Sequence, residues 1–426
     1  MSIKTIQEES LTALADAIRE KTGGEDLLEF PNGMVNTIKD FNLVPDTAFH
    51  ITGNARYRFA YNNNLWLLKK YGDKITTQNI TYRDYMFYES NLLEEIPFDI
   101  NLSGNNFSLN YAFYNCSKLK KIPPINGKAC SFDSTFYGCK QLEEIPNLTW
   151  QTQSSEYADM ASMFYDCQQL KAAPYIYNAK PTDMKGMFTN CCRLKVIPED
   201  YVDTWNWDYF HTYKYGYGGS VFSNCYSLRT IPLNLTHNLW NIYSSSGSSM
   251  YTSLFNACSS LDEVKELGVT TASYSSNILS GVVSACYRLK DFTFRTNEDG
   301  TPQTAQWKSQ VIDLSSYIGY ASTSYESRIT GYNSGITEDK KVIDDETYQA
   351  LKNDPDWFTS DVNYSRYNHD SAVNTINSLP DCSATGANTI KFKGASGSLT
   401  DGGAINTMTE EEIAVAAAKG WTVTLV

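Results

Sequence analysis

The stretch Phe113-Tyr-Asn-Cys116-x-x-Leu119-x-x-Ile122-Pro123 contains the pattern that decides how this chain folds. The same order of an aromatic residue, x-x-Cys, x-x-Leu and usually x-x-Ile-Pro recurs, in clear or degenerate form, between residues 59 and 289. A unit of about 25 residues cannot bury a core alone and must stack on its neighbours. We therefore expect a solenoid in which equivalent Phe, Cys and Leu side chains form continuous columns.

Each unit is expected to contain one helical turn followed by a short strand. Apolar residues precede the aromatic position at the spacing of a helical turn, as in Met160-x-x-Met163-Phe164. Downstream, Leu-x-x-Ile-Pro predicts a few extended residues, which the Pro ends because it cannot donate a ladder hydrogen bond. Loops between units differ in length, and the step from Phe188 to Phe222 is one of the long ones.

This motif resembles the leucine-rich repeats of the BspA-like bacterial surface-protein family over residues 50–295. The resemblance implies a scaffold on which binding surfaces are built. Repeats and flanks together predict an α/β repeat fold, a leucine-rich-repeat-like solenoid with a small helical N-terminal module and a C-terminal helix/strand cap. The expected domains are an N-terminal attachment module (residues 1–41), the solenoid (42–295), an irregular Ser/Tyr-rich segment (296–343) and a repeat-like cap (344–426).

The N-terminal module is predicted to consist of two short helices. Thr5-x-x-Glu8 matches a capping box, and the following apolar residues lie on one helical stripe that ends at Gly23-Gly24. A second helix is expected at residues 34–41. One interpretation is a cap for the open end of the solenoid, and the other is an attachment peptide whose contact residues are Leu11, Leu14, Ile18, Met34, Ile38 and Phe41.

The attachment interpretation is favoured by a second resemblance. Ala17-Ile-Arg-Glu-Lys-Thr-Gly-Gly24, followed by Phe30-Pro-Asn-Gly33, is similar to a leader found on tail and baseplate proteins of bacteriophages. The resemblance implies a virion protein assembled in the host cytoplasm, which contacts other virion proteins through its N-terminus. It also accounts for an N-terminus without a signal-peptide core, because virion proteins are released by lysis.

The C-terminal part regains regular patterns after the irregular segment. Helices are expected at residues 345–353, 372–379 and 409–419, and strands at residues 389–392 and 421–426. Thr409-x-x-Glu412 matches a capping box and Gly420 is a natural helix stop. Alternating helix and strand here would seal the end of the solenoid.

Composition excludes several classes of partner and site. With 35 Lys and Arg against 48 Asp and Glu, the formal charge is −13, and no basic cluster predicts a nucleic-acid partner. No apolar run approaches the ~20 residues that a membrane helix needs, so we expect no membrane insertion. Most cysteines occupy one repeat position and are expected to be small buried thiols. Cys191-Cys192 lacks a second pair at zinc spacing, so neither a metal nor a cofactor is predicted.

Aromatic residues are concentrated where the repeat period is broken, in a chain with 30 Tyr and 8 Trp. Aromatic rings can cover the C–H face of a sugar while Asp and Asn bind its hydroxyls, so these insertions are candidates for contact with a host surface glycan or protein. The alternative is packing on the solenoid flank or in a homo-oligomer. The candidate receptor-binding residues are Tyr201, Trp205, Trp207, Tyr209, Phe210, Tyr213, Tyr215, Tyr217, Trp240 and Tyr243.

Catalysis is not predicted. The four His residues have no partner at nucleophile or metal spacing, and no P-loop, G-x-S-x-G or H-E-x-x-H motif is present. A carboxylate pair for cleavage of wall or capsule glycan remains the one enzymatic alternative. The leading hypothesis is a phage tail, baseplate or fibre protein that binds the host surface. Its alternatives are a purely structural virion subunit, in the baseplate or as head decoration, and a bacterial leucine-rich-repeat adhesin.

Overall fold

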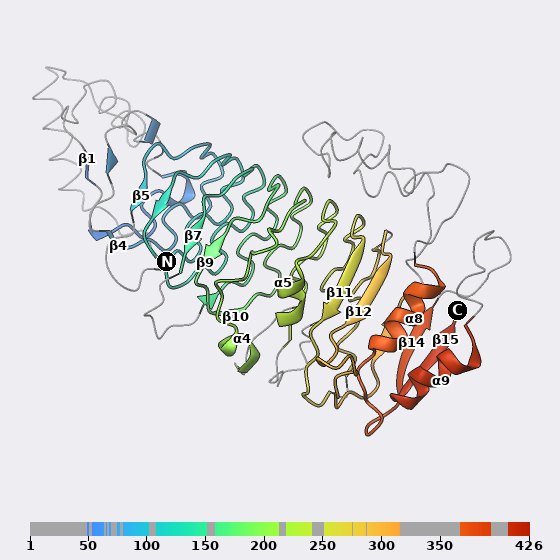
Figure 1. The fold of residues 1–426 in the computed structure, drawn as a ribbon. Helices are drawn as coiled ribbons and strands as arrows, with labels where there is room; N and C mark the ends of the chain where they lie inside the picture. Colours follow the sequence, from blue (N-terminus) through green and yellow to red (C-terminus); the bar gives the residue numbers. More distant parts are fainter. Residues whose placement is uncertain are drawn as a thin grey trace, which may run out of the picture.

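The repeats lie side by side in one elongated stack that follows the order of the sequence (Figure 1). In this computed structural model, the predicted N-terminal module and the helix predicted at residues 345–353 lie outside the described residues. The predicted irregular segment is described only up to residue 315. The structure describes residues 49–50, 53–63, 65, 68–69, 75–76, 80–101, 108–150, 158–212, 219–240, 251–274, 276–286, 288–315, 367–392 and 408–426.

Strands within the stack are short and pair in parallel with the equivalent strand of another repeat. Most of them are two or three residues long, because the Pro that follows Ile in many units cannot donate a ladder hydrogen bond. The pairs are β1 (Phe49–His50) with β3 (Ile75–Thr76), β2 (Gly53–Asn54) with β4 (Ile80–Tyr82), β5 (Ile100–Asn101) with β6 (Ile125–Asn126), β7 (Leu148–Thr149) with β9 (Ile176–Tyr177), β8 (Ala158–Asp159) with β10 (Pro181–Asp183), and β11 (Glu263–Leu267) with β12 (Asp291–Phe294).

The predicted fold class, an α/β leucine-rich-repeat-like solenoid with a helical turn in each unit, is wrong. The described repeats consist of short parallel strand pairs and consecutive turns, and the few helices among them are the 3-10 turn η1 (Ala60–Asn62), α4 (Asp208–Thr212) and α5 (Leu233–Asn238). At the helical turn expected before Phe164, Ser162 has a left-handed φ of 52°. Such a residue interrupts the helical hydrogen-bond series. The N–H of Ser162 donates instead to the carbonyl of Lys185 in the next repeat, at 2.9 Å.

The aromatic residues that anchor the repeats form one buried column. The rings of Phe113, Phe136 and Phe164 are stacked face to face with centroids 5.3 and 5.7 Å apart, as the repeat phase predicts. The column continues to both sides, from Phe59 at one end to Phe255 at the other. Burial of each such side chain stabilises the fold by roughly 1.5–3 kcal/mol, so this column is a main source of cohesion between repeats.

The repeated cysteines form a second column, in which each thiol donates to a backbone carbonyl of the preceding repeat. Cys139 Sγ lies 3.1 Å from the carbonyl oxygen of Phe113, and the thiols from Cys116 to Cys286 repeat this contact. Ser90 makes the same bond to Phe59 through its hydroxyl. All ten cysteines are free, and the seven at the repeat position are buried, which confirms the prediction of small buried thiols there. Burial raises the pKa values of Cys116, Cys139, Cys167 and Cys191 among the thiols of this column, so these four stay protonated donors.

The last part of the chain builds a three-stranded parallel sheet covered by two helices. The order is β13 (Val311–Asp313), β14 (Asn388–Phe392) and β15 (Trp421–Leu425), with α8 (His369–Ser378) and α9 (Glu410–Ala418) beside it (Figure 1). These elements overlap the helices predicted at residues 372–379 and 409–419 and the strands predicted at 389–392 and 421–426. The capping box predicted at Thr409 and Glu412 is confirmed, and Asn368 forms an equivalent one with Ser371.

Candidate binding surface

Four of the predicted receptor-binding aromatics lie inside the protein. Tyr201, Trp205, Trp207 and Phe210 are buried, and the most exposed of them, Trp207, retains 9% of its surface. Trp205 Nε1 donates to the carbonyl oxygen of Ile176 at 2.7 Å, and its ring lies 5.3 Å from that of Trp207. No ring in this group can present a face to a sugar. Their positions therefore favour the alternative of packing against the flank of the stack.

Other candidates cannot be assigned a position. The side chain of Tyr209 lies outside the described residues, and so do all of Tyr213, Tyr215, Tyr217 and Tyr243. The six candidate attachment residues also lie outside them, namely Leu11, Leu14, Ile18, Met34, Ile38 and Phe41. Among the predicted receptor-binding side chains that the structure describes, Trp240 is the one that is partly exposed.

Trp240 follows α5 and is held in a fixed orientation. Its partly exposed ring stacks on the imidazole of His211, with centroids 3.8 Å apart and planes 14° apart. His211 Nε2 is bonded to the carbonyl oxygen of Asn238 at 3.0 Å, and burial lowers the pKa of His211, so this ring is neutral near pH 7. A Cβ atom on Gly268 would lie 2.6 Å from Trp240 Cδ1. Only glycine leaves room for the indole here.

Beside this ring lies a depression of about 470 Å³, which we call the Trp240 depression. Arg295, Asn297, Gln303 and Thr304 supply hydrogen-bonding groups around it. The Asn297 amide donates to Thr301 and to the carbonyl of Pro302, which holds the lining turn in place. The volume of the Trp240 depression lies within the range of roughly 300–1,000 Å³ that is typical of small-molecule sites. A fixed aromatic ring among several polar groups is suited to one or two sugar units.

A second depression, of about 450 Å³, is lined in part by residues of α5. We call it the Asp200 depression, and it is lined by Glu199, Asp200, Asp203, Leu233, Asn234 and His237. Tyr175 donates its hydroxyl to Asp200 at 2.5 Å, which raises the pKa of Tyr175 to about 12. The Tyr175 ring is stacked on that of Tyr177, at 5.5 Å. The lining of this depression therefore has an excess of carboxylates, and Tyr175 lies beside it through its bond to Asp200.

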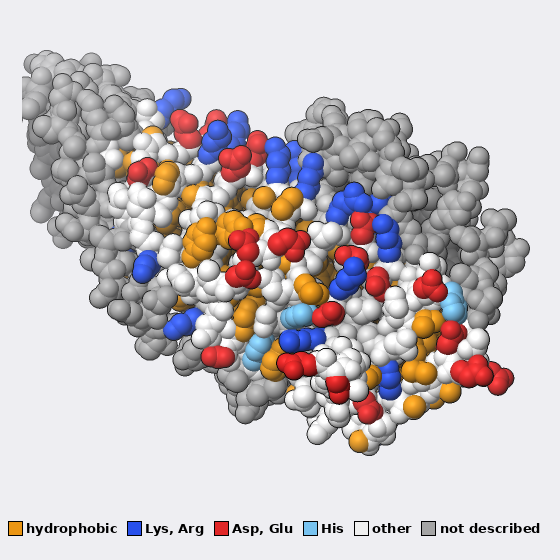
Figure 2. Space-filling view, viewed as in Figure 1, with side chains coloured by type: hydrophobic (Ala, Val, Ile, Leu, Met, Phe, Trp, Pro, Cys, Tyr) orange, Lys and Arg blue, Asp and Glu red, His pale blue; other side chains and the backbone are white. Residues whose placement is uncertain are grey.

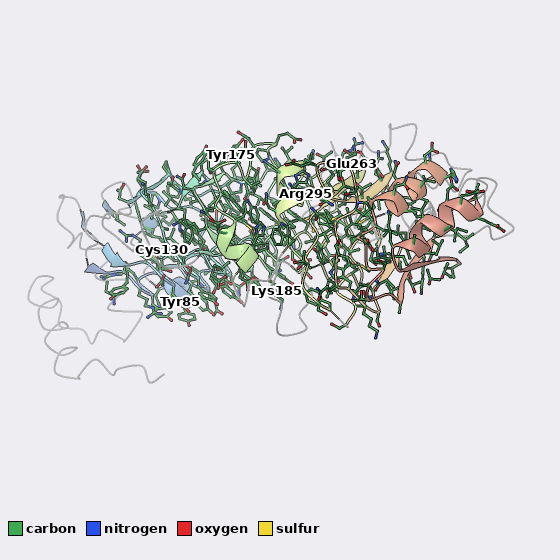
Figure 3. All side chains as sticks on the ribbon, turned by 60° about the horizontal axis from the view of Figure 1, so that its bottom comes forward. Tyr85, Cys130, Tyr175, Lys185, Glu263 and Arg295 are labelled. Carbon is green, nitrogen blue, oxygen red and sulfur yellow. The ribbon has the colours of Figure 1, made fainter. Side chains whose placement is uncertain are left out.

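The two depressions are adjacent because α5 supplies residues to one and precedes the tryptophan of the other. Asn234 donates to Asp203 on the Asp200 side, while the His237 carbonyl lies next to Gly268 on the Trp240 side. We call the surface that contains both depressions and Tyr175 the α5 strip. Hydrophobic, acidic and histidine side chains gather in this region of the space-filling view (Figure 2), and Tyr175 and Arg295 lie toward the same long side of the molecule (Figure 3).

Sequence reasoning found only Trp240 in this strip. The polar residues of the Trp240 depression come from the loop after β12, far along the chain, and only stacking of the repeats brings them beside the indole. A signal existed for the tyrosines, since Tyr175-Ile-Tyr177 alternates around a buried Ile176 and so exposes both rings on one side of a strand. No comparable signal marks Arg295 or Gln303.

In the described part of the chain, no group of three or more His, Cys, Asp or Glu side chains is arranged to hold a metal ion. None of the described helices has the length and apolar character required to span a bilayer.

Comparison with known protein families shows a match over part of the chain. Residues 107–230 match a family described as Mycoplasma protein of unknown function, DUF285. The matched segment contains the clearest repeats and the first half of the α5 strip. No curated protein and no solved structure matches the chain.

Proposed function

We propose that this protein is a bacteriophage tail, baseplate or fibre protein that binds the host cell surface through its repeat stack. The phage assignment rests on the N-terminal sequence that resembles tail and baseplate leaders. The binding role is supported by one observation above all: Trp240 is fixed against His211, partly exposed, and surrounded by polar groups in a depression of about 470 Å³.

A surface polysaccharide is the ligand that fits this strip best. The Trp240 ring can cover the C–H face of one sugar while Arg295 and Gln303 bind its hydroxyls. The adjoining Asp200 depression would hold further units of the same chain, which suits an extended polymer rather than a compact metabolite. Glu199, Asp200 and Asp203 would repel an anionic polymer, so the preferred glycan is uncharged or carries amines.

Sedimentation of the purified protein with insoluble glycans tests this proposal. We expect binding to intact bacteria or to a neutral wall polysaccharide, and weaker binding to an anionic teichoic acid. Trp240→Ala should weaken binding about tenfold or more, since a fixed aromatic at the centre of a contact is a typical hot spot. Binding that is unchanged in Trp240→Ala would exclude the Trp240 depression as the site.

Two control variants separate binding from stability. Tyr82→Ala removes an exposed ring outside the strip, 57% exposed, and should leave both properties unchanged. Trp205→Ala removes a buried ring, so it should lower the melting temperature while the folded fraction still binds glycan. If Trp205→Ala and Trp240→Ala lose binding only in proportion to unfolding, the strip has a structural role alone.

Each alternative function is favoured by a specific observation. Burial of Trp205 and Trp207 fits a structural virion subunit, in the baseplate or as head decoration, since these rings serve packing. The family match fits a bacterial repeat adhesin, because that family is described from Mycoplasma. Leu14→Asp in the full chain distinguishes these from the leading proposal. We expect it to abolish incorporation into phage particles while binding to cells persists, whereas a cellular adhesin would be absent from particles altogether.

A further inference from the structure

A second exposed surface, separate from the α5 strip, is formed by tyrosines on the first five repeats. Three of them stack in one row, Tyr57 on Tyr85 at 4.9 Å and Tyr85 on Tyr111 at 5.0 Å. A parallel row begins with Tyr61, which meets Tyr88 edge to face, and its remaining members stack. The rows touch where Tyr85 lies 5.4 Å from Tyr88. We call this surface the tyrosine patch, made of Tyr57, Tyr61, Tyr85, Tyr88, Tyr111, Tyr114, Tyr137 and Tyr165.

Stacking determines what the patch offers to a partner. Most ring faces are covered by the neighbouring ring, so the patch presents ring edges and hydroxyl groups. A sugar needs a free ring face, which makes this patch a poor counterpart of the α5 strip. Tyrosine-rich, amphipathic surfaces of this size are instead typical of contacts between proteins. Tyr57 and Tyr61, at one end, are 40% and 55% exposed.

Charge is distributed unevenly along the patch. At its first repeat, Arg56 and Arg58 are exposed, and the Arg56 guanidinium lies over the rings of Tyr57 and Tyr85, 5.6 and 5.0 Å from their centroids. Toward the other end, Asp133 lies beside Tyr111 and near the strand-paired carboxylates of Asp159 and Asp183. Burial raises the pKa of Asp183 to about 7, so this carboxyl is only partly ionised at neutral pH, and Lys185 offsets part of the remaining negative charge. One end is therefore basic and the other acidic.

From this arrangement we propose that the tyrosine patch binds a second copy of this chain in the reverse direction. The position three residues before each anchor Phe is filled in successive repeats by Arg56, Asp84, Asn110 and Asp133. A two-fold axis between the second and third of these repeats sets Arg56 opposite Asp133 of the partner subunit, and Asp84 opposite Asn110 of the partner subunit. Each charged residue then faces an opposite charge or an amide.

The spacing of the repeats allows all four of these positions to pair with their counterparts across the two-fold axis. The anchor rings of these four repeats, from Phe59 to Phe136, are separated by 5.1, 5.3 and 5.3 Å. A reversed copy therefore stays in register, and Tyr85 meets Tyr111 of the partner subunit. Figure 3 shows Tyr85 and Tyr175 toward opposite long sides of the molecule. Pairing through the patch consequently leaves both α5 strips exposed, where a dimer would gain avidity for a repetitive surface.

Sedimentation equilibrium of the full chain tests the proposal by charge exchange. The wild type should dimerise, and Arg56→Asp or Asp133→Arg alone should weaken the dimer about tenfold or more, because each places like charges in contact. An equimolar mixture of the two variants should restore dimerisation, since both contacts then join opposite charges. Lys118→Asp, an exposed change after Cys116, is the matched control and should have no effect.

The remaining outcomes each overturn the proposal. A wild type that stays monomeric up to ~100 µM has no such interface. A wild-type dimer that neither single variant weakens, or that the mixture fails to restore, uses another surface or direction. Asp133 also accepts a bond from Ser134 at 2.9 Å, so Asp133→Arg is accompanied by Asp133→Asn, which retains an acceptor. Asp133→Asn should fold normally and still weaken the dimer.

Discussion

The repeat stack and the C-terminal sheet solve the same packing problem in different ways. Between Phe59 and Phe255 the strands are short, and adjacent repeats are joined by columns of rings and thiols. In the C-terminal sheet, β14 and β15 pair over five residues each, from Asn388 with Trp421 to Phe392 with Leu425. Two helices with capping boxes, α8 and α9, pack beside this sheet. Side-chain columns therefore reinforce the backbone hydrogen bonds between turns in the repeat stack, whereas a continuous strand ladder joins the C-terminal sheet.

Removing one ring from each region should show the largest difference. Phe136 is fully buried between two stacked rings, at 5.3 and 5.7 Å, whereas buried Phe392 lies 6.2 Å from a single ring, that of Tyr367, among the described residues. Truncation of a buried Phe costs about 3–5 kcal/mol, and each aromatic pair adds about 0.5–1.5 kcal/mol. We expect the loss in the free energy of unfolding to lie near the upper limit for Phe136→Ala and near the lower limit for Phe392→Ala. Urea denaturation measures both losses.

Hydrogen exchange would show how far each change spreads. Phe136→Ala should lower protection in the repeats on both sides of it, because both lose a ring contact. Phe392→Ala should affect the C-terminal sheet alone. Equal cost and equal spread in the two variants would mean that the columns are no more important than the ladder.

The same contrast explains how much of the molecule the sequence predicts. The sequence predicts the phase of the repeats because Phe136, Cys139 and Leu142 occupy fixed positions in the repeat. It predicts the C-terminal elements because α9 has standard start and stop signals. The helical turn expected in each repeat before its anchor Phe is wrong. A clue was present, since the residue before the repeated Cys is often Asn or Gly, as at Asn115 and Gly138, and both have positive φ, at 57° and 71°.

The candidate site was less predictable than the fold. Trp205 and Trp240 look alike in sequence, as aromatics in long steps between anchors, yet one is buried and the other lines a depression. The difference depends on which residues of distant repeats lie beside each ring. Gly268 and Arg295 decide that for Trp240, and nothing in their local sequence indicates it.

A smaller effect is expected in the thiol column. Cys139→Ala would remove the thiol that lies 3.1 Å from the carbonyl oxygen of Phe113, which would keep the Cys116 N–H as its donor, and the loss of one such hydrogen bond costs about 1 kcal/mol. Cys139→Ser should cost less, because Ser90 makes the equivalent bond at the start of the column. Urea denaturation at pH 7 measures both. An alanine variant as stable as the serine variant would show that these thiols act through packing alone.

The pH dependence of the same variants provides an independent check. Burial raises the pKa of Cys139 above its ordinary value of 9.0. Its contribution to stability is therefore fully present below pH 9 and is lost as the pH rises further, because the unfolded chain then releases the proton. The stability difference between wild type and Cys139→Ser should shift against the wild type by about 1.4 kcal/mol per pH unit above 9.

The smallest change, Thr409→Ala, tests the C-terminal region by itself. The Thr409 side chain accepts from the Glu412 N–H at 3.2 Å, and Glu412 Oε2 accepts from the Thr409 N–H at 2.8 Å. Loss of an N-cap costs about 1 kcal/mol, and the ladder of β15 does not depend on it. Hydrogen exchange should therefore increase in α9 while β15 and the repeat stack keep their protection. Increased exchange in β15 as well would show that the helix and the strand unfold together, and that the backbone ladder is not self-sufficient.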